Sequence, residues 1–136
     1  MKVKEIMCDN VYSVGVDTPI EQIAQHMKRL NVGMIPVCTD SGHIKGVVTD
    51  RDIVIRAVAG EIKNLTAKEI MSENIVTVEP DTDTHDAALI MAGYKIRRLP
   101  VVKDECIKGI VALGDIAERK AYIDEAGDVL HSVSKN

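Results

Sequence analysis

Two stretches of this chain decide its fold: IKGVVTDRDI at residues 44–53 and IKGIVALGDI at residues 107–116. They are copies of one another, 63 residues apart. Toward the N-terminus the correspondence continues at an offset of 64 residues, as far as KEIM at residues 4–7 and KEIM again at residues 68–71. A single one-residue gap keeps nineteen identities in register, where ordinary residue frequencies would supply about three. The chain is therefore a tandem repeat of one supersecondary unit.

Each repeat predicts a β-α-β-β-α unit, a mixed α/β (α+β) arrangement. Short apolar runs rich in β-branched residues, bounded by turn residues, indicate strands. The expected strands are Val11–Val14, Met34–Cys38 and Ile44–Thr49 in the first repeat, and Ile75–Val78, Leu99–Val102 and Ile107–Ala112 in the second.

Helix-start patterns lie between the first and second strands of each unit. Thr18 and Glu21 have the spacing of a capping box, with Pro19 at the first helical position. Thr82 is expected to cap the second helix in the same way. The last helix of each unit is expected to begin near Asp52 or Asp115, where a carboxylate can serve as the N-cap.

One such unit leaves a face of its sheet bare, so two must pack together, and the repeat predicts pseudo-twofold symmetry. We expect one repeat over residues 1–63 and the other over residues 64–126, joined by a linker at Gly60–Thr66. Residues 127–136 are expected to form a flexible C-terminal tail.

Composition excludes several classes of function. The 46% of hydrophobic residues and 28% of charged residues predict a soluble globular protein. Net charge is zero over residues 1–63 and -4 over residues 64–136, and there is no Trp or Phe, so binding to a nucleic acid backbone is not expected. No apolar run approaches membrane-spanning length and no signal peptide is evident, which predicts a cytoplasmic protein without membrane contact.

No pattern in the sequence predicts catalysis. The fingerprints of hydrolases, metalloproteases and mononucleotide-binding loops are absent from the sequence. The four histidines fall on expected surface positions, and the three cysteines form no CxxC pair. We therefore expect neither an enzyme nor a metal protein. A metal site remains an alternative only if folding gathers Cys8, Cys38 or Cys106 near a histidine.

The most informative polar residues follow the last strand of repeat one. Asp52 could be only a helix cap, but a cap at Asp52 does not explain Thr49 three residues earlier. A carboxylate accepts two hydrogen bonds and a hydroxyl donates one, so this pair could hold the ribose and phosphate of a ligand. Arg97 and Arg98 could be solvated charges at a sheet edge. Pseudo-twofold packing would instead turn them toward Thr49 and Asp52 as a phosphate clamp.

Taken together, the repeated strings resemble CBS domains. The matching strings are KEIM at 4–7, VGMIPV at 32–37, GVVTDRDI at 46–53, KIRRLPVV at 95–102 and GIVALGDIA at 109–117. The chain is most similar to small stand-alone bacterial proteins made of one CBS pair. The resemblance implies a Bateman module whose two clefts bind AMP, ADP, ATP or a related adenosyl ligand.

The resemblance also implies roles for individual residues. Asp52 and Asp115 would hold ribose hydroxyls, and Thr49, beside Arg51, would help to hold phosphate. Arg97 and Arg98 would reach phosphate across the repeat boundary. Adenine would lie against residues of the early strand and of the Pro-Val segment, namely Val11, Ser13, Met34, Ile35 and Pro36 in one half and Ile75, Thr77, Leu99 and Pro100 in the other.

The second copy departs from the pattern where Ala112 replaces the threonine and Gly114 replaces Arg51. The cleft around Thr49 and Asp52 is therefore expected to bind more tightly than the cleft around Asp115. The resemblance implies a regulatory homodimer that signals to an unknown effector protein. The alternative is a structural or adaptor protein with vestigial clefts.

Overall fold

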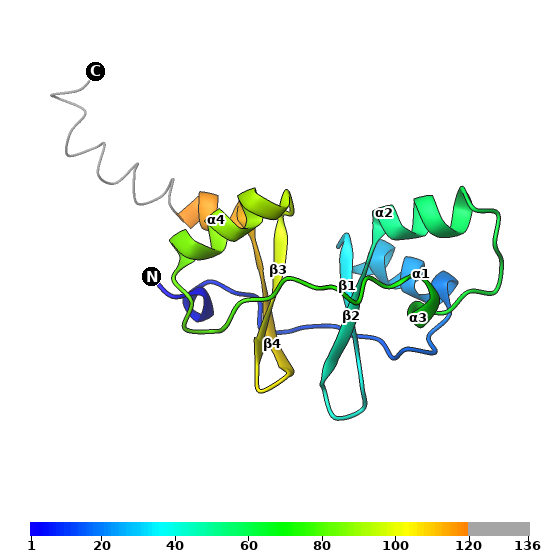
Figure 1. Cartoon of the computed structure of the whole chain (residues 1–136), viewed down its shortest axis with the longest axis horizontal. Coiled ribbons are helices and arrows are strands. Elements are labelled where there is room, and N and C mark those ends of the chain that lie inside the picture. The colour runs from blue at the N-terminus through cyan, green and yellow to red at the C-terminus, as the bar shows by residue number, and fades with distance from the viewer. Residues whose placement is uncertain (120–136) are drawn as a thin grey trace, which may run out of the picture.

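The computed structural model describes residues 1–119, and the expected tail at 127–136 lies outside them. Two halves stand side by side, each with a hairpin facing the other half and helices on its outer side (Figure 1). One half contains α1 (Ile20–Leu30), β1 (Met34–Cys38), β2 (Ile44–Thr49), α2 (Asp50–Asp52) and η2 (Ile53–Val58). The other contains α4 (Thr84–Tyr94), β3 (Arg98–Lys103), β4 (Cys106–Ala112) and the helical residues 113–119. The short helices η1 (Val3–Glu5) and α3 (Ala67–Ile70) complete the order of elements.

The two hairpins have the same register. Val37 pairs with Gly46 in the first, and Val101 pairs with Gly109 in the second. Both sheets contain a register shift at the next residue. The tips of the hairpins are hydrogen-bonded across the two halves, with Ile44 donating to the carbonyl of Glu105 at 3.0 Å. The mixed helix-and-strand fold with two matching repeats confirms the expected fold class.

The expected strands at Val11–Val14 and Ile75–Val78 are wrong. Each is reduced to a single parallel bridge, Val14 with Val37 and Val78 with Val101. Val14 donates to the carbonyl of Pro36 and accepts from Cys38. Extending the ladder toward the N-terminus would need a donor at Pro36, and proline has none. Pro100 stops the second ladder for the same reason.

The predicted caps of the long helices are also wrong. α1 begins after Pro19, which makes no side-chain cap, while the Thr18 hydroxyl accepts from the Gly15 amide at 3.1 Å. α4 is capped by Asp83, whose carboxylate accepts from the His85 amide at 2.8 Å. In both cases the threonine hydroxyl closes the preceding turn, so the helix starts one residue later than expected.

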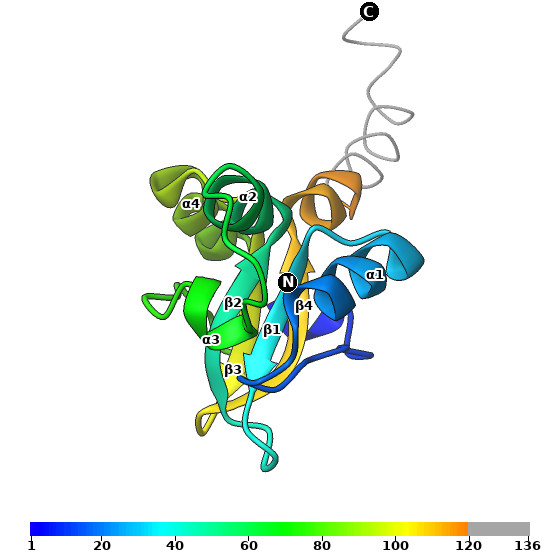
Figure 2. The same cartoon turned by 90° about the vertical axis from the view of Figure 1, so that its right-hand side faces the viewer.

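Each hydrophobic core draws residues from both repeats. Val3 is fully buried against Leu99 and Val111 of the second half, and Ala67 and Ile70 pack among buried residues of the first. In Figure 2, α3 lies beside the first hairpin. The short helix that opens each repeat therefore completes the core of the other half.

Two glycines allow this exchange of segments. Ser72 and Val47 donate to each other's carbonyls at 2.9 and 3.1 Å, and Cys8 and Ile110 are paired in the same way at 2.9 Å. A side chain at Gly46 would lie 2.7 Å from the carbonyl oxygen of Ser72, and one at Gly109 would lie 2.6 Å from Sδ of Met7. The repeated Ile-Lys-Gly sequence therefore marks where the exchanged segment crosses each hairpin.

Candidate functional site

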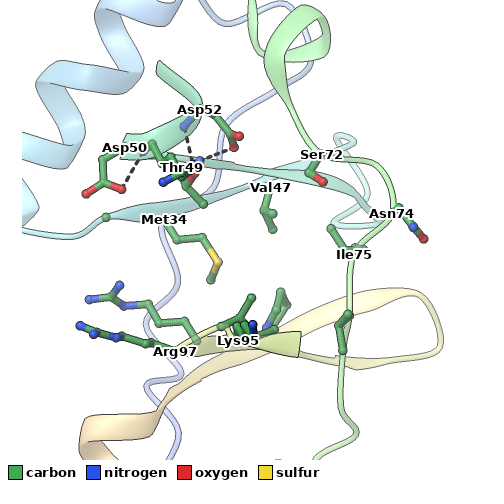
Figure 3. Close-up of a pocket in the computed structure, with 16 residues that line it drawn as sticks. Met34, Val47, Thr49, Asp50, Asp52, Ser72, Asn74, Ile75, Lys95 and Arg97 are labelled. Carbon is green, nitrogen blue, oxygen red and sulfur yellow. Dashed lines mark hydrogen bonds between the residues drawn. The ribbon is translucent and has the colours of Figure 1, made fainter. Parts of the chain in front are cut away.

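A cleft of about 660 Å³ opens between the two halves at the ends of β2 and β3. We call it cleft one. One wall carries Thr49 and Asp52, and the opposite wall carries Lys95 and Arg97 (Figure 3). The remaining lining residues are Gly33, Met34, Val47, Asp50, Arg51, Ser72, Asn74, Ile75, Val76, Ile96, Arg98 and Pro100.

Thr49 and Asp52 form a capping box at the start of α2. The Thr49 hydroxyl accepts from the Asp52 amide at 3.1 Å, and Oδ2 of Asp52 accepts from the Thr49 amide at 2.9 Å. The three-residue spacing that capping by Asp52 alone did not explain is thus explained by reciprocal capping with Thr49 as the N-cap. The structural role and a ligand-binding role are compatible, because the Thr49 hydroxyl keeps its proton to donate.

The Asp52 side chain lies at the edge of cleft one, beside Arg56. It is only 16% exposed, and Oδ1 lies 3.9 Å from Nε of Arg56. Arg56 in turn donates through Nη1 to the carbonyl of Ile70 at 2.9 Å. Arg56 therefore connects the cleft carboxylate to α3, the segment that belongs to the other repeat.

Cleft one has an excess of positive charge. Arg51, Lys95, Arg97 and Arg98 line it, against the carboxylates of Asp50 and Asp52. Within residues 1–119, no carboxylate comes within 4.0 Å of any of these four cations. The cations are thus available to an anionic group entering from solvent.

A second cleft, of about 470 Å³, occupies the related position at the end of β4. We call it cleft two. Asp115 takes the place of Asp52 there, and Ala112 takes the place of Thr49. Its other lining residues are Cys8, Asn10, Val11, Tyr12, Leu30, Val32, Met34, Arg98 and Ile110. Met34 and Arg98 line both clefts.

The structure separates the predicted site residues into two groups. Those brought into a cleft are Val11, Met34, Thr49, Arg51, Asp52, Ile75, Arg97, Arg98, Pro100 and Asp115. The side chains of Ile35, Pro36 and Leu99 are buried in their own half instead. Thr77 lines a separate cavity of about 270 Å³ beside His43 and Glu105.

Ser13 lies near the buried Cys38 rather than in a cleft. Burial raises the pKa of the Cys38 thiol, and the Ser13 side chain opposes this with a smaller lowering. The backbones of Cys106 and His43 form an isolated antiparallel β-bridge between the hairpin tips. No group of three or more His, Cys, Asp or Glu side chains placed to hold a metal ion occurs among residues 1–119. The described helices include none that is long and apolar enough to cross a membrane.

Sequence reasoning missed several lining residues, among them Asp50, Lys95, Asn10, Asn74 and Tyr12. A usable indication was present for the asparagines. Asn10 and Asn74 are identical at matched positions of the repeat, and each lies in one cleft. Lys95 follows α4 with a left-handed backbone conformation, which the sequence did not reveal.

Comparison with known proteins gives a consistent result. The family model described as "CBS domain" matches residues 3–58 and 67–122. The CBS domain-containing protein YhcV of Bacillus subtilis is 40% identical over 133 residues, covering 97% of this chain and 94% of that protein.

Solved structures agree with this match. The CBS domain pair of protein MJ0100, in complex with 5′-methylthioadenosine and S-adenosyl-L-methionine, is 28% identical with a TM-score of 0.82, covering 89% of this chain and 96% of that one. Hypoxic Response Protein I with two coordinated zinc ions is 30% identical with a TM-score of 0.79, covering 88% and 98%. The matched repeats, the exchanged segments and the paired clefts together with these relatives show that the chain belongs to the CBS domain family, as a CBS domain pair.

Proposed function

We propose that this CBS pair is a non-catalytic, cytoplasmic regulatory module that binds an adenine nucleotide, AMP, ADP or ATP, in cleft one. The observation that carries the proposal is the charge arrangement of that cleft. A carboxylate and a hydroxyl from the first half face cations from the second, so one ligand would contact both halves. Ligand binding would then favour one relative packing of the halves, and a partner could read that preference.

The polar groups have complementary tasks in this proposal. Oδ1 of Asp52 accepts a hydrogen bond from a ribose hydroxyl, while Oδ2 stays in the capping box. The Thr49 hydroxyl donates to a phosphate oxygen, and Arg97 and Arg98 neutralise the phosphate charge. Support for an adenosyl ligand comes from the MJ0100 pair, which was solved with two such molecules.

Calorimetric titration of AMP, ADP and ATP tests the proposal. Asp52→Asn keeps an acceptor for the cap but loses the charged ribose contact, so affinity should fall at least tenfold. Asp115→Asn is the matched control in the other cleft and should leave the tighter binding event unchanged. Equal losses in both variants would contradict the assignment of cleft one.

Thermal unfolding separates a sensor from an adaptor with vestigial clefts. A nucleotide at one hundred times its dissociation constant adds about 2.7 kcal/mol to the free energy of unfolding. A vestigial cleft adds nothing at any concentration. The zinc-containing relative makes metal analysis of the purified protein a useful companion measurement.

We further propose that the module is a homodimer. Val54, Ile55 and Val58 of η2 are 55%, 53% and 69% exposed, and Leu89 and Tyr94 of α4 are 58% and 64% exposed. Both helices lie on the same side of the molecule (Figures 1 and 2). Exposed apolar side chains in such numbers are typical of an interface. Sedimentation should show a dimer that Val58→Lys weakens, and a wild-type monomer at 100 μM would contradict this.

A further inference from the structure

Cleft two differs from cleft one in its charge. Repeat positions pair Arg51 with Gly114, Lys95 with Asn31 and Arg97 with Gly33. Every cation that belongs to cleft one alone is thus replaced by a neutral residue in the other copy. Among residues 1–119, the lining of cleft two retains one carboxylate, Asp115, and one cation, the shared Arg98.

The shared cation is placed toward cleft one. A side chain built at Gly33, which lines cleft one, would lie 3.6 Å from Nη1 of Arg98 and 3.0 Å from Oδ2 of Asp50. The Arg98 guanidinium and the Asp50 carboxylate thus both lie beside Gly33 in cleft one, without forming an ion pair within 4.0 Å. A phosphate in cleft two would lose its hydration without gaining a dedicated cation, and that loss is costly.

Within the part of the chain that the structure describes, an aromatic ring lines cleft two and none lines cleft one. Tyr12 occupies the position of Val76, and its side chain is held by neighbours on α1. The Tyr12 hydroxyl and Nε2 of His26 are 2.6 Å apart, and the ring centroids are 4.4 Å apart. Arg29 lies 2.9 Å from Nδ1 of the same His26 and 5.8 Å from the Tyr12 ring centroid.

These contacts hold the ring in place, and Tyr12 as a residue remains 38% exposed. A ring held in position at a cleft can stack on a purine base without a large loss of side-chain freedom. The apolar residues Leu30, Val32 and Met34 line the same cleft and would cover an uncharged substituent of the nucleoside.

From this geometry we infer that the two clefts select different classes of ligand: cleft two takes a purine nucleoside without a 5′-phosphate, and cleft one takes the phosphorylated nucleotide. The inference rests on the proposed function and assigns the ligand class of its second site. Asp115 holds the ribose, Tyr12 stacks on the base, and the 5′ end lies among neutral residues. The module would thus respond to the ratio of nucleoside to nucleotide rather than to one ligand.

Titration of the full chain with adenosine and with AMP tests the inference. In Asp52→Asn, where cleft one is impaired, adenosine should bind at least tenfold more tightly than AMP. In Asp115→Asn the preference should reverse. Tyr12→Val, which installs the residue found at position 76, should weaken adenosine binding about tenfold, and Tyr12→Phe should keep it within threefold because the ring remains.

A gain of function provides the matched experiment. Asn31→Lys and Ala112→Thr place, at the repeat-matched positions of the other copy, the lysine and threonine that line cleft one. Lys95 already adopts at φ 57° the left-handed conformation that Asn31 has at φ 54°. In the Asp52→Asn background the double substitution should raise AMP affinity at least tenfold.

The possible failures are distinguishable. If none of AMP, ADP, ATP and adenosine binds the wild type, the proposed function is overturned and the inference with it. If AMP binds cleft one while Asp52→Asn shows no preference for adenosine, the inference alone is overturned. Chemical-shift changes at Tyr12 on adding adenosine, but not AMP, would be expected in the same variant.

Discussion

Replacing Gly46 by alanine should destabilise the exchange of segments between the two halves. The new Cβ would lie 2.7 Å from the carbonyl oxygen of Ser72 and 2.9 Å from Sδ of Met71. The methionine can rotate away, but the backbone oxygen cannot. Ser72 must therefore shift, which stretches its two hydrogen bonds with Val47 at 2.9 and 3.1 Å.

The expected cost follows from these contacts. Overpacking of a buried position costs about 1–3 kcal/mol, and each weakened hydrogen bond gives up about 0.5–1.5 kcal/mol. Partial relaxation of the segment makes the sum about 2–4 kcal/mol. For a chain of this size the melting temperature should fall by about 4 °C for each kcal/mol.

Urea unfolding followed by circular dichroism measures this cost. Gly109→Ala should behave similarly, because its Cβ would lie 2.9 Å from the carbonyl oxygen of Cys8. Gly93→Ala in α4 is the control. Its Cβ would meet nothing within 4 Å, and alanine favours a helix by up to about 1 kcal/mol. A loss below about 0.5 kcal/mol for Gly46→Ala would refute the close crossing at Ser72.

Three further outcomes are expected. Thr49→Ala removes the N-cap of α2 and should lower the unfolding free energy by about 1 kcal/mol in urea without ligand, and an unchanged midpoint would contradict the capping box. Hydrogen bonding and charge from Lys4 and then Lys2 lower the pKa of Asp81 below its ordinary value, so the stability it contributes is present above about pH 4 and is lost as the pH falls toward the lowered pKa. Lys4→Met should therefore weaken this acid dependence, which melting curves between pH 2 and pH 6 would record. Native alkylation should modify the exposed Cys8 well before the buried Cys38, whose pKa is raised by burial, and mass spectrometry showing Cys38 first would count against the packing of β1.

Much of the fold could be predicted from the repeat alone. The strands Met34–Cys38 and Ile44–Thr49 were predicted with the bounds they have, because each is a short apolar run ended by turn residues. The strand predictions were wrong where a proline in the partner strand outweighed β-propensity. The early strands contain β-branched residues, but Pro36 and Pro100 each remove the donor that a longer ladder needs.

Part of the candidate site could also be predicted from the sequence. Thr49, Asp52, Arg97 and Arg98 stood out because they were polar residues beside buried strands, and all four line cleft one. Tyr12 and Lys95 gave no such indication. Each lies in a cleft only because residues of the other half pack opposite it. That packing cannot be deduced from the few residues around Tyr12 or Lys95.

The sequence by itself determined the duplication, the bounds of the two strands in the first hairpin and the inequality of charge between the copies, because these depend on residue order. Only the tertiary structure decided that each short helix completes the opposite core and that Arg98 is shared between the clefts. Those features arise from contacts between residues distant in the chain, and such contacts exist only once the two halves have packed together.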